Sequence, residues 1–176
     1  MTCDHEHVVL RPFEASDRER LVRMFDRLSP SSVYRRFFTI FPKLDGPVLA
    51  HLTAVDHVDH ESVVAVLGDE IVGLAGYDRR AGERDTAELS VLVEDDCHRR
   101  GLARRLLRDV TRRARDQGVT RVTVSMLTEN QPALGLLRSI EPDVTLIRDG
   151  TEVQAAMPVR PRRATAAAST PAMVRT

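Results

Sequence analysis

Apolar and polar positions along the middle of the chain follow two different periods, and each period predicts a different element. Residues 62–67 and 71–77 are two apolar, β-branched runs separated by Gly68-Asp69-Glu70. A glycine-containing turn between two such runs is typical of a β-hairpin. Residues 86–93 then place an apolar side chain at every second position, with Glu88 among the intervening residues. Because strand side chains alternate between faces, we expect Glu88 to point away from the valine-bearing face.

The clearest helical pattern covers residues 101–117. Its apolar positions recur every three or four residues, and Gly118 stands where a left-handed residue commonly ends a helix. The buried stripe of this helix is expected to be Leu102, Leu106, Val110 and Ala114.

Weaker patterns complete a succession of strands and helices. The spacing of Ser16 and Glu19 fits a capping box for a helix that runs to Leu28, and Ser29-Pro30-Ser31-Ser32 breaks that helix and starts a second short one. The remaining expected elements are strands at 7–11, 119–126, 144–147 and 152–158 and a helix at 131–139. This alternation predicts an α/β or α+β fold, with helices packed on the faces of a sheet.

Length and charge restrict the functional classes. The 176 residues suffice for one domain, which we expect at 1–159, followed by a flexible tail at 160–176 rich in Ala, Pro and Arg. Lysine and arginine (26) balance aspartate and glutamate (26), so neither nucleic acid nor an anionic membrane is an expected partner. Without a signal peptide or a membrane-spanning run, a cytoplasmic monomer or homodimer is expected.

The residues that commonly bind metals give no clear site. Cys3 and Cys97 lie far apart and have no CxxC partner, so we expect reduced thiols and no thiolate zinc site. His57 and His60 form a His-x-x-His pair near two aspartates, but a third ligand at metal-binding spacing is missing. A surface loop is the preferred interpretation, and no metal is expected.

The loop between the strand at 86–93 and the helix at 101–117 carries the candidate chemistry. It reads Asp95-Asp96-Cys97-His98-Arg99-Arg100-Gly101-Leu102-Ala103. The N-terminus of a helix has unpaired backbone N–H groups and a partial positive charge, and both favour phosphate. Gly101 and Ala103 leave the backbone approachable, while Arg99, Arg100 and Arg104 add charge. The pattern predicts a pyrophosphate site.

These residues also resemble a known family. His98-Arg99-Arg100-Gly101-Leu102-Ala103 resembles the Gln/Arg-x-x-Gly-x-Gly/Ala coenzyme A signature of the GNAT N-acetyltransferases, and residues 87–93 and 126–130 fall where that family has its bulged fourth strand and its fifth strand with a following Asn. The resemblance covers residues 8–159. It implies a GNAT fold with a mixed, mostly antiparallel sheet of six to seven strands flanked by about four helices, and acetyl-CoA as co-substrate.

The N-terminal half refines the resemblance. Residues 28–38 and Leu52-Thr53-Ala54-Val55-Asp56 are similar to bacterial protein lysine acetyltransferases of the Pat type, which implies a lysine acceptor on a protein such as a metabolic enzyme. The sequence also departs from the wider family. His98 replaces the usual Gln or Arg, and Leu137 stands where many members have the Tyr that protonates the leaving thiolate; Pat-type enzymes lack that Tyr too.

The resemblance implies direct attack of an amine on the thioester. An amine such as lysine is protonated at neutral pH, so a base must remove a proton, and Glu88 is the candidate. Backbone N–H groups near Leu92 are expected to hold the thioester oxygen. Val91 and Val93 are expected to pair with the pantetheine, and Asn130 to contact the cofactor or the amine. The candidate cofactor-binding residues are therefore Val91, Val93, His98, Arg99, Arg100, Gly101, Leu102, Ala103, Arg104 and Asn130.

Simpler interpretations of the same residues remain open. Glu88 fits an exposed strand face, and Asn130 fits the N-cap of the helix that begins at Gln131. Three other functions also fit the chain: a small-molecule amine acetyltransferase, a noncatalytic acetyl-CoA sensor, and a nucleic-acid-binding module that uses the arginine-rich helix and tail.

Overall fold

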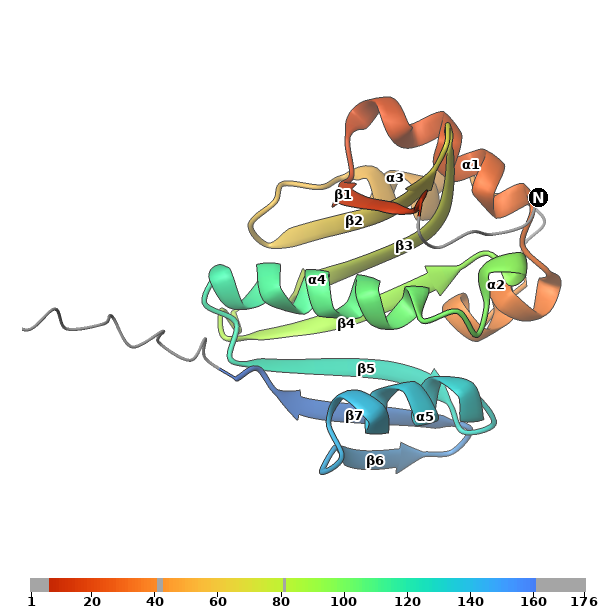
Figure 1. Cartoon of the computed structure of the whole chain (residues 1–176). Coiled ribbons are helices and arrows are strands. Elements are labelled where there is room, and N and C mark those ends of the chain that lie inside the picture. The colour runs from red at the N-terminus through yellow and green to blue at the C-terminus, as the bar shows by residue number, and fades with distance from the viewer. Residues whose placement is uncertain (1–6, 41–42, 81, 161–176) are drawn as a thin grey trace, which may run out of the picture.

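Seven strands form one sheet in the order β1-β2-β3-β4-β5-β7-β6 (Figure 1). The computed structural model describes residues 7–40, 43–80 and 82–160. Every neighbouring pair of strands is antiparallel except β4 and β5, which are parallel. The strands are β1 (Val9–Pro12), β2 (His60–Leu67), β3 (Glu70–Arg79), β4 (Thr86–Val93), β5 (Arg121–Leu127), β6 (Thr145–Asp149) and β7 (Glu152–Pro158). The expected mixed, mostly antiparallel sheet is confirmed.

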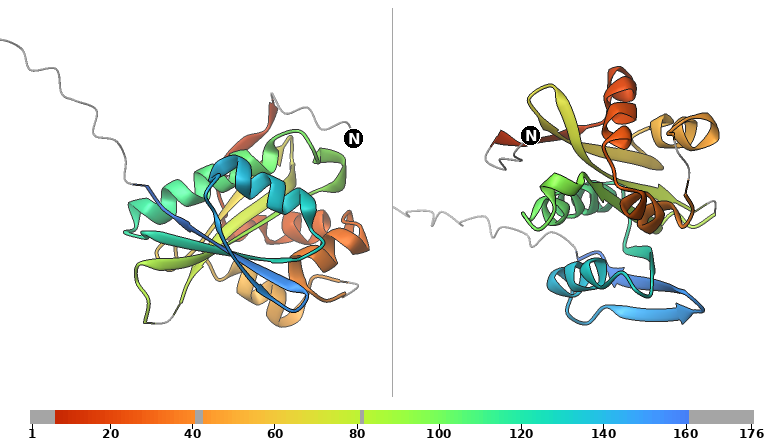
Figure 2. Two further views of the ribbon diagram at one scale, coloured as in Figure 1. Left: turned by 90° about the horizontal axis from the view of Figure 1, so that it is seen from below. Right: turned by 90° about the vertical axis from the view of Figure 1, so that its right-hand side faces the viewer.

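Helices cover both faces of this sheet (Figure 2). One face carries α1 (Arg18–Asp26), α2 (Pro30–Phe37) and α3 (Gly46–Thr53), and the other carries α4 (Leu102–Asp116) and α5 (Gln131–Ile140). Two short 3-10 turns, η2 (Ala15–Asp17) and η3 (Asp95–Cys97), precede α1 and follow β4. The described residues therefore contain one helix more than expected, because the sequence patterns did not indicate α3.

A hydrophobic core fills each of the two layers. Tyr77 of β3 and Leu106 of α4 belong to the core between the sheet and α4. Met24 of α1 and Leu74 of β3 belong to the core beneath α1 to α3. Gly73 allows α4 to lie close to β3, since a Cβ atom there would come within 2.9 Å of a methyl carbon of Leu106.

The two periods in the sequence correctly identified the elements around the site. The strand β4 has the expected bounds; Ala87 and Leu89 are buried against α4, and Glu88 lies on the opposite face. The helix α4 buries the expected stripe and is followed by Gly118 with a φ of 87°.

The expected start of the first helix is wrong. The capping box is formed two residues earlier than predicted, by Glu14, the N-cap of η2, and Asp17, and not by Ser16 and Glu19. Asp17 is fully buried and accepts hydrogen bonds from the Arg11 guanidinium at 2.6 and 2.7 Å and from the Glu14 N–H at 3.0 Å. This ion pair with the partly exposed Arg11 fixes the buried carboxylate that caps the turn.

The last described residue, Arg160, belongs to the folded part of the chain. Its guanidinium pairs with the Glu141 carboxylate at 3.0 Å. The remainder of the predicted tail, residues 161–176, lies outside the described residues. Among the helices of the described residues, none combines the length and the apolar character that crossing a membrane requires.

Candidate active site

A cleft opens where the parallel strands β4 and β5 separate. The two strands pair only from Thr86 with Arg121 to Glu88 with Thr123. Beyond Glu88 they diverge, as Figure 1 shows. A cavity of 460 Å³ lies there, lined by β4, the loop that leads to α4, the end of β5 and the first turns of α5. This volume is within the usual range of ligand-binding pockets.

The N-terminus of α4 forms one end of the cleft. Gly101 occupies the N-cap with a φ of 77°, and Arg99 also has a positive φ of 58°. The first N–H to bond within the helix is that of Arg105, which donates to Gly101, so the preceding N–H groups have no acceptor in the helix. Arg99 and Arg104 line the cleft beside these groups. The arrangement suits a phosphate-bearing ligand.

Glu88 lines the cleft where the strands begin to separate. Its carboxylate accepts a hydrogen bond of 2.8 Å from the Ser125 hydroxyl of β5. Ser125 lies two residues beyond Thr123, the register partner of Glu88, so its side chain emerges on the same face of the sheet. The bond joins the two diverging strands and orients the carboxylate.

Arg36 of α2 brings a positive charge to the same region. It lines the cleft, and its charge interacts with those of Glu88 and Asp78. Burial lowers the pKa of Arg36 from its ordinary value, while the two carboxylates act in the opposite direction.

The backbone of β4 faces the cleft at alternate residues. The Glu94 N–H donates to Val72 of β3, and the register of β3 and β4 continues without a bulge. By alternation, the N–H groups of Val91 and Val93 point away from β3, toward the cleft, whereas that of Leu92 belongs to the row that faces β3. The Val93 carbonyl accepts a hydrogen bond from His98 Nε2 at 2.9 Å.

Asn130 has the simpler of its two expected structural roles. It is the N-cap of α5, and its side-chain oxygen accepts from the Ala133 N–H at 3.2 Å. The residue also lines the cleft. The N-cap prediction is confirmed, and the contact with the cofactor or amine stays a prediction.

The structure gathers nearly all the predicted site residues around this one cleft. The predicted residues that line it are Glu88, Val91, Leu92, Val93, His98, Arg99, Gly101, Leu102, Ala103, Arg104 and Asn130. Arg100 does not line it. Leu137 is 2% exposed and packs in the core, so α5 presents Leu136 to the cleft instead.

The sequence analysis missed the two cleft residues that interact with Glu88, namely Ser125 and Arg36. Ser125 lies inside a predicted strand, but the pairing of β4 with β5 that brings it to Glu88 is not visible in a single sequence. Arg36 lies within residues 28–38, and the resemblance of that segment to Pat-type enzymes indicated no role for this arginine.

Hydrogen bonds to the Asp95 carboxylate connect the loop before α4 to α2. Asp95 accepts from the Ser29 N–H at 2.9 Å and from the hydroxyls of Ser29 and Ser32 at 2.8 Å each. Burial raises the pKa of Asp95, but these hydrogen bonds outweigh it, so the pKa lies below its usual value. The prediction that residues 29–32 start a second helix is confirmed, and the cap is Ser29, whose Oγ accepts from the Ser32 N–H.

The expectation of reduced thiols is wrong for Cys97. This residue of η3 is buried and disulfide-bonded. Separation along the chain does not tell which sulfur atoms the fold brings together.

Comparison with known proteins supports this interpretation of the cleft. Residues 23–140 match the model of the Acetyltransferase (GNAT) family. An acetyltransferase of Pseudomonas aeruginosa is 28% identical over 160 residues, covering 85% of this chain and 83% of the relative. The crystal structure of the GNAT domain of PAT from S. lividans superposes with a TM-score of 0.78 at 28% identity, covering 85% of this chain and 89% of that domain.

A more distant structure has the same fold together with a ligand. The acetyltransferase yncA of Salmonella typhimurium, solved with its cofactor acetyl-CoA, superposes with a TM-score of 0.70 at 18% identity and covers 90% of this chain and 97% of that one. The match of the family model over most of the described domain, together with the cleft at the N-terminus of α4, identifies the chain as a member of the GNAT family and an acetyl-CoA-dependent acetyltransferase.

Proposed function

We propose that this chain transfers an acetyl group from acetyl-CoA to a primary amine, the side chain of a protein lysine, with Glu88 as general base. The observation that carries the proposal is the position of the Glu88 carboxylate in the same cleft as the N-terminus of α4. The similarity to the GNAT domain of S. lividans PAT supports a protein acceptor.

The proposed position of the cofactor follows from the groups that line the two ends of the cleft. The diphosphate lies at the first turn of α4, beside Arg99 and Arg104. The pantetheine amides then run along β4 and pair with the outward-facing backbone of Val91 and Val93, as an added strand would. In this proposed arrangement the thioester lies near Leu92 and Glu88.

The reaction joins the amine nitrogen to the thioester carbonyl carbon. A lysine amine with a reference pKa of about 10.4 is protonated at neutral pH, so Glu88 accepts a proton from it, directly or through a water molecule. The carbonyl oxygen gains negative charge during attack, and a backbone N–H group near Leu92 stabilises it. The C–S bond then breaks, giving the amide and coenzyme A.

The part of α5 that lines the cleft has no acid that could protonate the leaving thiolate. The described residues of this helix that line the cleft, Pro132, Ala133 and Leu136, carry no acidic proton. Leu137 also provides none. The proposed mechanism therefore depends on a base for the amine and on no tyrosine acid.

The deciding experiment compares wild type with Glu88→Gln. We expect acetyl transfer to a lysine-bearing protein to fall by about two to four orders of magnitude at neutral pH, while calorimetry finds little change in acetyl-CoA affinity. An unchanged rate contradicts the role of Glu88. Turnover of small amines but not of protein lysines contradicts the acceptor, and binding without any turnover indicates a sensor.

A further inference from the structure

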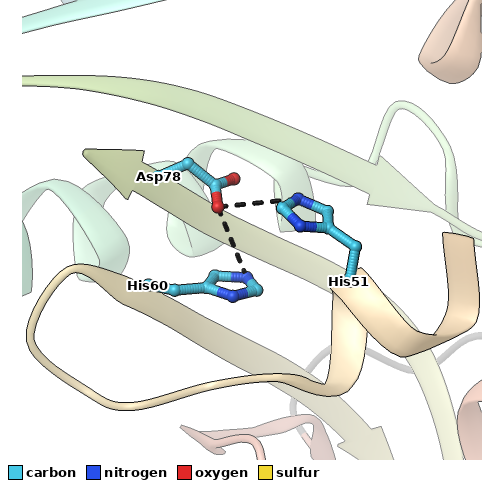
Figure 3. Close-up of side chains that lie close together, drawn as sticks. All are labelled: His51, His60 and Asp78. Atoms are coloured by element: carbon cyan, nitrogen blue, oxygen red, sulfur yellow. Dashed lines mark ion pairs between the residues drawn. The ribbon is translucent and has the colours of Figure 1, made fainter. Parts of the chain in front are cut away.

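Two histidines and one aspartate from three separate elements meet on the α1–α3 face of the sheet. His51 comes from α3, His60 from the start of β2 and Asp78 from the end of β3 (Figure 3). One ligand atom from each lies within 4.8 Å of the others. We propose that these three residues bind a Zn²⁺ ion, and that the ion slows acetyl transfer.

The distances from the aspartate oxygen to the two histidine nitrogens fit ligands of one shared metal ion better than they fit direct hydrogen bonds. Asp78 Oδ1 lies 3.5 Å from His51 Nε2 and 3.7 Å from His60 Nε2. Both distances exceed the ordinary range for hydrogen bonds between N–H and oxygen. In a tetrahedral zinc site with bonds of about 2.0–2.1 Å, neighbouring ligand atoms are separated by about 3.4 Å. The aspartate oxygen is therefore placed almost as a zinc ligand would be.

The orientation of His60 supports the same conclusion. Its Nδ1 lies 3.0 Å from the Ala54 carbonyl oxygen, which can only accept, so Nδ1 carries the proton. In the neutral ring the lone pair is then on Nε2, which faces the cluster. Metal-binding histidines almost always donate their second ring N–H to a carbonyl or carboxylate in this way. Only 14% of the His60 side chain is accessible, so the surrounding residues restrict its movement.

His51 supplies the adjustable ligand. Its ring is 5.0 Å from that of His60 between centroids and tilted by 15°. Because 60% of its side chain is exposed, His51 can change rotamer to bring Nε2 to the ion. Two imidazoles and one carboxylate form a donor set suited to zinc, which in open sites has three protein ligands and one exchangeable position.

His57, the other histidine of the His-x-x-His pair, does not belong to this cluster. His57 turns to the buried Glu61 carboxylate, with Nδ1 2.9 Å from Oε1, while His60 faces Asp78. The sequence analysis did not find the cluster because its three residues come from three elements that only the fold brings together.

The cluster lies beside the proposed base. His60 is the register partner of Asp78, and Asp78 is the register partner of Glu88, so the three side chains form a row on one face of three adjacent strands. A bound dication adds positive charge next to Glu88 and repels a protonated amine that approaches it. Arg36, whose charge also acts on Asp78, already contributes in that direction and competes with the ion for the aspartate. This effect on transfer rests on the proposed function; the metal site does not.

Binding is tested by calorimetric titration of the full chain with ZnCl₂, with MgCl₂ as the comparison ion. We expect one Zn²⁺ per chain and no comparable Mg²⁺ binding, and a loss of affinity of about tenfold or more in His60→Gln and in Asp78→Asn. The matched control is His57→Gln, which removes the neighbouring histidine and is expected to keep the affinity. Thermal unfolding without metal establishes that each variant folds, and Co²⁺ added to the wild type is expected to give the visible absorption bands of a low-coordinate site.

The outcomes separate the site from the catalytic proposal. Absence of Zn²⁺ binding, or affinity that survives the His60 and Asp78 substitutions together, overturns the site whether or not the chain acetylates lysine. Where transfer is measured, Zn²⁺ is expected to inhibit competitively against the amine in wild type and in His57→Gln, but not in His51→Gln. Zn²⁺ binding without a change in rate overturns the inhibitory effect and leaves the role of Glu88 to its own test.

Discussion

Glu88 and Ser125 are joined by a 2.8 Å hydrogen bond across the point where β4 and β5 begin to separate, with the serine hydroxyl as donor. The serine acts on the reaction only through the carboxylate, so it is a positioning residue. Loss of one hydrogen bond of this kind weakens the orientation of the base without removing it.

Ser125→Ala is therefore expected to lower kcat for acetyl transfer by about two- to tenfold, with little change in the affinity for acetyl-CoA. The check is a double-mutant cycle with Glu88→Gln. Because both changes act on the same carboxylate, adding Ser125→Ala to Glu88→Gln is expected to cost nothing further. Independent, multiplying losses would show that Ser125 has a separate role.

The arginines that line the cleft are expected to bind the diphosphate of acetyl-CoA. Reversing Arg99 and Arg104 to Glu should weaken acetyl-CoA binding by about tenfold or more, because two attractive charges at the helix N-terminus become repulsive. The matched control is Arg108→Glu, an exposed position on the same helix that does not line the cleft. Equal losses in both variants would indicate a general charge effect and no local site.

The elements predicted best from the sequence are those in which the apolar pattern repeats several times. The strand β4 and the helix α4 were placed correctly because eight alternating and fifteen helical residues each repeat their pattern several times. The loop between them was recognised because its glycine and arginines have a local chemical meaning.

The sequence predicted least where function depends on contacts between distant segments. The helix α3 has only eight residues, with Leu49 and Leu52 as its buried positions, which is less than a clear repeat. The pairing of Glu88 with Ser125 and the cluster around Asp78 both depend on the order of strands in the sheet, and the pattern of a single chain does not contain that order.

Gly76 marks a place where β3 tolerates no side chain. A Cβ atom there would lie 2.8 Å from the backbone oxygen of Glu61 in β2, so the two strands would have to move apart. We expect Gly76→Ala to lower the free energy of unfolding by about 1–3 kcal/mol, measured by urea denaturation.

Gly135→Ala is the matched control for this prediction. Gly135 lies within α5, and a Cβ atom there meets nothing within 4 Å. Since alanine favours the helix over glycine, this variant is expected to gain about 0.5–1 kcal/mol. Similar effects of the two substitutions would refute the steric explanation.

Asp95 joins the loop before α4 to α2, so the free energy of unfolding depends on the ionisation of this carboxyl group. Its pKa in the folded protein is below the unfolded value of about 3.9, because hydrogen bonds from Ser29 and Ser32 outweigh the cost of burial. The stabilisation is thus fully present above the unfolded pKa and is lost as the pH falls through the folded pKa. Asp95→Asn should cost about 1–3 kcal/mol at pH 7. The difference from wild type should shrink in urea denaturation near pH 3, where other carboxylates titrate in both proteins and cancel. The matched control is Asp96→Asn at the neighbouring exposed position, which is expected to change the free energy of unfolding little at either pH. If Asp95→Asn loses the same free energy at both pH values, the charge of the carboxylate does not hold the loop.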